Sequence, residues 1–133
     1  MKKTLLTLCL AITMSFSFSQ QTINLTPSDV IQNVLDTLTM QDAVIISLAP
    51  GTYNESISLF NIPTTIANTL TIQSADINNM AIITDAANNV INVGIGNAKL
   101  KSLKVVSNLG VSISITDYSS MSVNNFRIEI LIY

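Results

Sequence analysis

Leu48-Ala49-Pro50-Gly51-Thr52-Tyr53-Asn54-Glu55-Ser56-Ile57-Ser58-Leu59 joins two β-rich runs through a proline–glycine turn. Pro50 ends the first run, because proline has no backbone N–H to give to a sheet. Gly51 supplies a turn conformation that residues with a Cβ resist. Tyr53 has a large apolar face and a polar tip, which suits the seam between two packed elements. Glu55 is expected to point outward, by alternation with the apolar residues that follow it.

An amphipathic helix is predicted before this turn, over about residues 27–39, and the strand 44–48 follows it. Thr26 is the expected N-cap, with Pro27 at the first helical position and Asp29 at the capping-box position. A helix of this length needs an apolar surface to dock on, so it is expected to cover the first strands. The apolar stripe that would face those strands consists of Val30, Ile31, Val34, Leu35 and Leu38.

Short β-branched runs separated by Asn, Asp, Gly and Ser continue to the last residue, which is typical of strands and turns. A period of about 20 to 25 residues indicates a solenoid, in which each repeat buries its apolar face against its neighbours. The spacing alone leaves a β-sandwich open. Two series of runs carry the period: Leu70-x-Ile72, Ile91-x-Val93 and Val111-x-Ile113, and then Ile82/Ile83, Leu103 and Met121/Val123.

The turn and its surroundings resemble the first coil of the pectin lyase-like right-handed parallel β-helix proteins. Leu70-Thr71-Ile72-Gln73-Ser74 is similar to the family's second-coil strand, and Leu100-x-x-Leu103-x-Val105-x-x-Asn108 to its recurring coil. The resemblance implies an all-β chain, a right-handed parallel β-helix (β-solenoid) of about four short coils with an N-terminal capping α-helix. In the family's enzymes the catalytic residues lie several coils further on. A structural role is therefore implied for Pro50, Gly51, Thr52, Tyr53 and Glu55.

The first residues have the three-part layout of a secretory signal peptide. A basic start precedes the apolar run Leu5–Met14, and the small residues Ser17 and Ser19 follow it. The chain is therefore expected to be secreted, extracellular or periplasmic after cleavage, with a bacterial source. No later apolar run is long enough to span a membrane. The predicted organisation is a signal peptide at 1–19 and the N-terminal portion of a β-helix domain at 20–133, with the capping helix at about 27–39 and coils at about 43–133.

Charge and composition exclude several function classes. Without Lys2 and Lys3, four basic residues stand against eight acidic ones, so nucleic-acid binding is not expected. The chain has no histidine, and its one cysteine lies in the signal segment, so the commonest general base is missing. Asp76, Asp85 and Asp117 fall at separate turns and are expected to form those turns rather than a calcium site. No catalytic, cofactor-binding or metal residue and no cofactor is predicted.

Lys99, Lys101 and Lys104 form a basic cluster that is expected to project from one coil. They are candidate contacts for an acidic polysaccharide, or they belong to a solvated outer face. Three function classes remain open. The chain is a secreted or cell-surface β-helix module, structural or glycan-contacting and without a catalytic site of its own. Alternatively it is the truncated N-terminal part of a larger carbohydrate-active, polysaccharide lyase-like enzyme, or a small self-assembling β-solenoid.

The terminal run Phe126–Tyr133 has strong β-propensity, low charge and no proline. A solenoid needs a covering element at each end, and this strand is expected to leave an open edge that pairs with another chain. The partners expected from the sequence are therefore a polysaccharide, a C-terminal continuation of the β-helix, or a second copy that joins through the edge of the terminal strand.

Overall fold

The structure of the chain is a computed structural model. It describes residues 20–39, 42–60, 62, 69–87, 89–93, 97–107, 113–115, 120–124 and 127–130. The predicted signal peptide lies outside the described residues. The elements in chain order are β1 Gln21–Leu25, α2 Ile31–Thr37, β2 Val44–Leu48, β3 Thr52–Asn54, β4 Ile57–Leu59, β5 Leu70–Ser74, β6 Ile82–Asp85, β7 Ile91–Val93, β8 Asn97–Lys101, β9 Lys104–Ser107, β10 Ile113–Ile115, β11 Ser120–Asn124 and β12 Arg127–Ile130.

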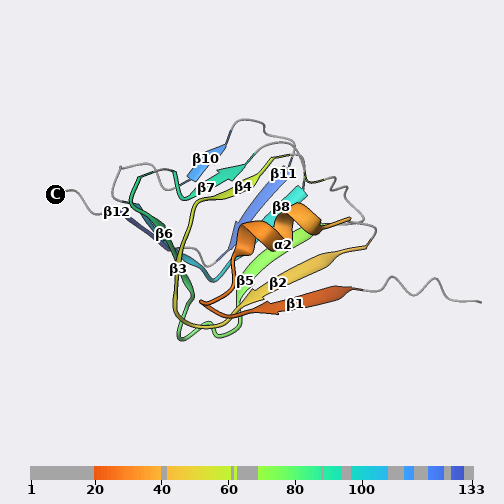
Figure 1. Cartoon of the computed structure of the whole chain (residues 1–133), viewed down its shortest axis with the longest axis horizontal. Helices are drawn as coiled ribbons and strands as arrows, with labels where there is room; N and C mark the ends of the chain where they lie inside the picture. Colours follow the sequence, from red (N-terminus) through yellow and green to blue (C-terminus); the bar gives the residue numbers. More distant parts are fainter. Residues whose placement is uncertain are drawn as a thin grey trace, which may run out of the picture.

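The strands form three sheets, and all the strand pairs within the described residues are parallel. Sheet A has the order β1-β2-β5-β8-β11, sheet B the order β3-β6-β9-β12, and sheet C the order β4-β7-β10. From β2 onward the chain visits sheets A, B and C in turn and then returns to sheet A (Figure 1). We call each such pass a coil. Within the described residues the fold is strand-rich, with parallel sheets and one helix near the N-terminal end.

Alternation along the strands stacks apolar residues of successive coils on one another. The inward positions of one strand pair in register with the inward positions of the next, so apolar rows run from coil to coil. These rows place the core between the three sheets, and each coil buries its apolar face against its neighbours. The central rows are Ile46, Ile72 and Leu100 in sheet A, Tyr53, Ile83 and Val105 in sheet B, and Ile57 and Ile91 in sheet C, all at most 1% exposed.

The helix begins later than its sequence predicted. α2 starts at Ile31 and ends at Thr37, whereas the expected helix started at Pro27. The predicted N-cap, Thr26, instead closes a turn with Asp29. The Thr26 N–H donates to the Asp29 carboxylate at 2.7 Å, and the Asp29 N–H donates to the Thr26 carbonyl at 2.9 Å. These reciprocal bonds satisfy Thr26 and Asp29 outside the helix, so the residues form a separate turn in front of it.

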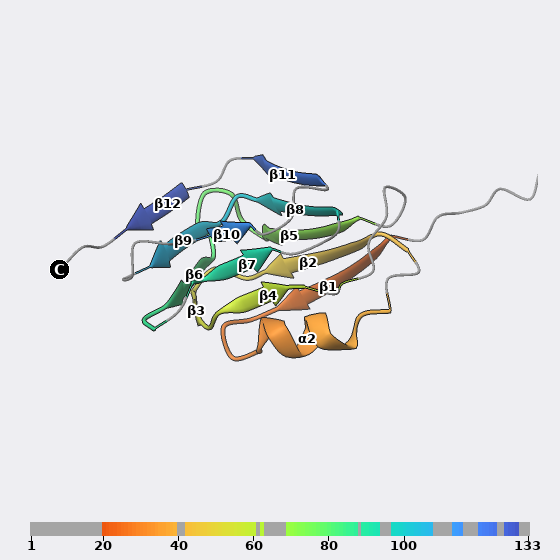
Figure 2. The same ribbon diagram turned by 90° about the horizontal axis from the view of Figure 1, so that it is seen from above.

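The apolar stripe of α2 is narrower than predicted. Val30, its expected first member, is 47% exposed, so that part of the prediction is wrong. Ile31 and Leu35 are buried, and Val34 and Leu38 are partly buried and pack against the core. The buried face contacts β4, the last strand of sheet C at this end. Figure 2 shows α2 at the end of the molecule that carries β1, and β11 and β12 at the opposite end.

Two features of the strand order departed from the sequence prediction. β1 was not predicted, although it pairs along its whole length with β2. The predicted series that joined Leu70 to Ile91 is wrong, because Leu70 pairs with Val44 and Ala98 in sheet A. Ile91 belongs to sheet C, where it pairs with Ile57 and Ile113.

The second predicted series is partly wrong. The prediction that Ile83 and the region of Leu103 occupy equivalent positions in successive coils agrees with the structure, since Ile83 pairs with Val105 in sheet B. Its next step fails, because Met121 pairs with Ala98 in sheet A. Each coil contains three strands with similar apolar patterns, so the pattern recurs about three times in each coil. Spacing along the chain therefore grouped strands that belong to different sheets.

Leu35→Ala should lower the free energy of unfolding by about 2–5 kcal/mol, because it removes a buried side chain between α2 and the first coil. Leu35 is 3% exposed. Asn33→Ala, at an exposed position of the same helix, is the matched control and should change stability by no more than about 0.5 kcal/mol. Urea unfolding of both variants measures the difference. Equal midpoints would show that α2 contributes nothing to the stability of the coils.

Candidate functional site

The turn Pro50–Glu55, called the opening turn below, holds the N-terminal segment against the first coil. Gly51 has a φ of +141°, a conformation that L side chains rarely adopt. A Cβ on Gly51 would lie 2.4 Å from the Cγ of Pro27. The turn formed by Thr26 and Asp29 therefore sits directly on Gly51, and only glycine allows this approach. Pro50 precedes it, and Thr52 begins β3 with an exposed side chain.

Tyr53 follows Gly51 by two residues in the opening turn, and its side chain is 1% exposed. Its hydroxyl is 3.0 Å from the carbonyl oxygen of Leu25 and 3.1 Å from that of Ala49, and can donate to either. The Ala49 N–H also donates to the Leu25 carbonyl at 2.8 Å. The end of β1 is thus tied to the end of β2 by backbone and by side chain. Burial raises the pKa of the Tyr53 hydroxyl above its ordinary value, with the Asp29 carboxylate as a second cause.

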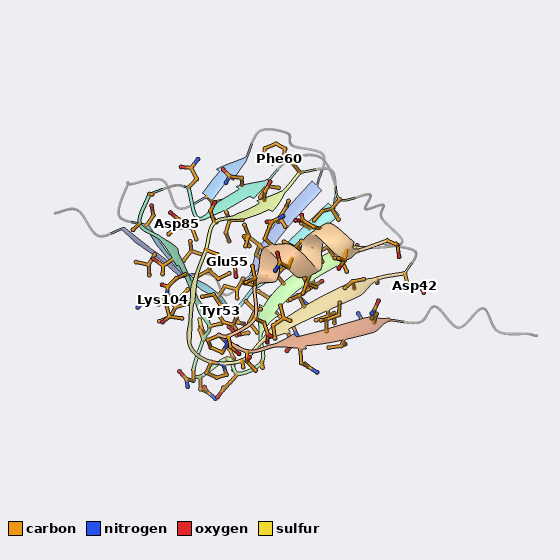
Figure 3. All side chains as sticks on the ribbon, viewed as in Figure 1. Asp42, Tyr53, Glu55, Phe60, Asp85 and Lys104 are labelled. Carbon is orange, nitrogen blue, oxygen red and sulfur yellow. The ribbon has the colours of Figure 1, made fainter. Side chains whose placement is uncertain are left out.

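Glu55 caps α2. Its Oε1 accepts the Ile31 N–H at 2.9 Å and its Oε2 accepts the Gln32 N–H at 3.1 Å. These amides belong to the first turn of the helix, where N–H groups have no partner within the helix. The N-cap residue, Val30, has no side-chain hydrogen bond to them. The expectation that Glu55 points outward is therefore wrong, because its carboxylate turns to the positive end of the helix (Figure 3).

Gln32 covers the outer edge of β4. Its Oε1 accepts the Ser58 N–H at 2.7 Å, and its Nε2 lies 3.5 Å from the Ser58 carbonyl oxygen. The same Nε2 donates to the Asp36 carboxylate at 2.7 Å. The side-chain amide thus takes the place that a peptide group of a further strand would occupy. An edge that would otherwise pair with another chain is satisfied within the molecule.

The structure brings together two of the three candidate lysines. Lys99 and Lys101 lie in β8 and alternate with the buried residues Ala98 and Leu100, so both project from the outer face of sheet A. Lys99 is exposed and Lys101 is partly exposed. Lys104 begins β9 and belongs to sheet B, on a different face.

The outer face of sheet A carries polar side chains in rows that cross its strands. In register, one row consists of Thr22, Ile45, Thr71 and Lys99, and the next of Asn24, Ser47, Gln73 and Lys101. Thr71 and Ser47, in the middle of these rows, are each buried at 8% exposure. None of the strands of this sheet contains an aspartate or a glutamate. Among the side chains that the structure describes, the accessible polar groups of this face are the Thr22 hydroxyl, the Asn24 and Gln73 amides and the two lysines. The sequence missed this face because Lys99 and Lys101 were grouped with Lys104 by proximity in the chain.

A cavity on the sheet B side of the molecule has Lys104, labelled in Figure 3, in its lining. Its volume is about 280 Å³, and Ile77, within its lining, is 53% exposed. The loop that forms it contains Asp76, whose carboxylate accepts the Asn78 N–H at 2.8 Å. Asp85 likewise accepts the Ala87 N–H at 2.7 Å. Both aspartates thus form turns as predicted, whereas Asp117 lies outside the described residues.

Within the described residues, no three Asp, Glu, His or Cys side chains come close enough to hold a metal ion. In the same part of the chain, no helix has the length and apolar character needed to cross a membrane. No family model matches the chain, and neither a curated protein nor a solved structure matches it.

Glu55→Gln should destabilise the protein by about 1–2 kcal/mol, because it removes the charge and one acceptor from the cap of α2. Far-ultraviolet circular dichroism during thermal unfolding measures the loss. Asp42→Asn is the control, since Asp42 is exposed and the exchange removes the same charge. An equal change in melting temperature for the two variants would mean that the loss comes from net charge and not from the cap.

Proposed function

We propose that this chain is a right-handed parallel β-helix module that works outside the cell, as a structural or glycan-contacting element. The repeated order of sheets A, B and C supports this fold. Crossovers between neighbouring parallel strands are right-handed in nearly all proteins, and that supports the hand. The layout of residues 1–19 supports export.

The outer face of sheet A is the observation that carries the glycan proposal. Its accessible polar groups are Thr22 and Asn24 on β1, the partly exposed Gln73 on β5, and Lys99 and Lys101 on β8. Hydroxyl and amide side chains donate and accept hydrogen bonds with sugar hydroxyls. Lys99 and Lys101 add positive charge to a face without acids, which favours glycans that carry carboxylates or sulfates.

We also propose that copies of the chain associate through the end that carries β10, β11 and β12. Each of these strands is the last of its sheet within the described residues. Strand edges offer backbone donors and acceptors to another chain. The predicted terminal strand falls partly within β12, Arg127–Ile130, and its remaining residues lie outside the described residues.

Lys99→Ser combined with Lys101→Ser should weaken binding to polygalacturonate several-fold, because each exposed ion pair contributes up to about 1 kcal/mol. Titration calorimetry at low salt measures the affinity, and raised salt should remove most of the difference. Lys104→Ser, which changes a cation on sheet B, is the control and should bind like the parent. Loss of binding in the control but not in the double variant would move the site to the cavity beside Lys104.

A further inference from the structure

The first strand of sheet A has an open edge. The Gln21 N–H donates to the Ala43 carbonyl at 3.0 Å, and the Leu25 carbonyl accepts from Ala49. Because backbone groups alternate in direction along a strand, Thr22 and Asn24 direct their N–H and carbonyl groups away from β2. Within the described part of the chain, no strand lies on that side of β1.

Sheet C is covered at this end, and the N-terminal turn packs beside the start of sheet B. β4 is covered by α2, through the Gln32 amide that pairs with Ser58. β3 follows Gly51, against which Pro27 packs. Among the described residues, this end therefore leaves two strands without a further neighbour, the three-residue β3 of sheet B and the five-residue β1 of sheet A. The β1 edge has no charged residue, proline or bulge that would prevent pairing with a further strand.

The two ends of the molecule are complementary in shape. Sheet A ends at β11 and sheet B at β12, but sheet C ends at β10, in the preceding coil. Within the described residues, the far end thus has a step one strand deep on the side of sheet C. At the near end, α2 occupies the position of sheet C beside β4 (Figure 2). A helix with its side chains is about 10 Å wide, which corresponds to about two strand spacings.

We propose that copies of this chain stack head to tail, with β1 of one copy paired in parallel with β11 of the next and α2 seated in the step above β10. This inference rests on the proposed self-association and names the two surfaces that meet. Translation along the stack keeps all the strands parallel. It also continues the backbone register that joins Ile23, Ile46, Ile72, Leu100 and Val123 from one copy into the next.

We assign a second copy of the chain as the partner of both ends. The near end has the free edge of β1 and the helix α2, and the far end has the free edge of β11 and the step above β10. Neither Gln21–Leu25 nor Ser120–Asn124 contains a charged residue, so the two edges meet without repulsion. Val30, at the start of α2, is 47% exposed at the same end and would gain cover in a stack. The two contact surfaces differ from each other, and such an interface continues as an open filament unless a rotation closes it.

Asn24→Pro tests the proposal. The Asn24 N–H points away from β2, so proline removes a donor from the open edge without breaking the ladder between β1 and β2. Sedimentation velocity over a range of concentrations should show assemblies of the parent chain that grow with concentration. The variant should sediment with the mass of a single chain. A minor fraction of the variant mixed with the parent should shorten the assemblies, because its β11 edge still binds and its β1 edge does not.

Thr22→Pro removes the neighbouring outward donor and should behave like Asn24→Pro. Ile23→Pro is the contrasting variant, since it removes a donor to β2 and should lower the melting temperature. A parent that remains a single chain at high concentration would overturn both the self-association and the stack. Parent dimers that persist unchanged in both edge variants would overturn the head-to-tail arrangement alone and would point to pairing between two C-terminal ends.

Discussion

The hydrogen bonds from the first turn of α2 to Glu55 hold the N-terminal end of the molecule together. A seven-residue helix is too short to be stable in water by itself. Glu55 supplies acceptors for two of its free N–H groups, and the helix in turn places Gln32 against the edge of β4. One carboxylate from the opening turn thus determines where the helix begins and how the first coil is covered.

The opening turn joins three separate contacts within six residues. Gly51 accommodates Pro27, Tyr53 bonds to the end of β1, and Glu55 caps α2. Each contact reaches back to the segment that precedes the first coil. A stack of coils has exposed edges at both ends, and here the turn at the start of the stack fixes the elements that cover one of them. The proposed head-to-tail association uses the edge of β1, which has no further strand on its outer side in the described residues.

Sequence patterns were sufficient for most of the strands, for two of the turns and for the presence of a helix before the first coil, but not for β1. The β-branched run 44–48 predicted the strand β2, and the side-chain chemistry of Asp76 and Asp85 predicted their turns. The start of α2 was misplaced because Thr26 and Asp29 satisfy each other in either a turn or a capping box.

The remaining features depend on contacts between distant residues. Glu55 and Ile31 are far apart in the chain, and only the fold brings the carboxylate to the helix. The pairing of Gln32 with Ser58 has no local signal either. Register was misjudged because each coil contains three similar strands, so apolar spacing alone does not identify the sheet to which a strand belongs.

Native-state hydrogen exchange tests most directly whether the opening turn and the N-terminal segment form one unit. In Tyr53→Phe, the lost hydroxyl contacts neither α2 nor β4. If the contacts act together, protection should fall by a similar factor at the Gln21, Gln32 and Ser58 amides, because a cooperative unit opens as a whole. A loss confined to the amides near Leu25 and Ala49, with full protection at Gln32 and Ser58, would contradict this account.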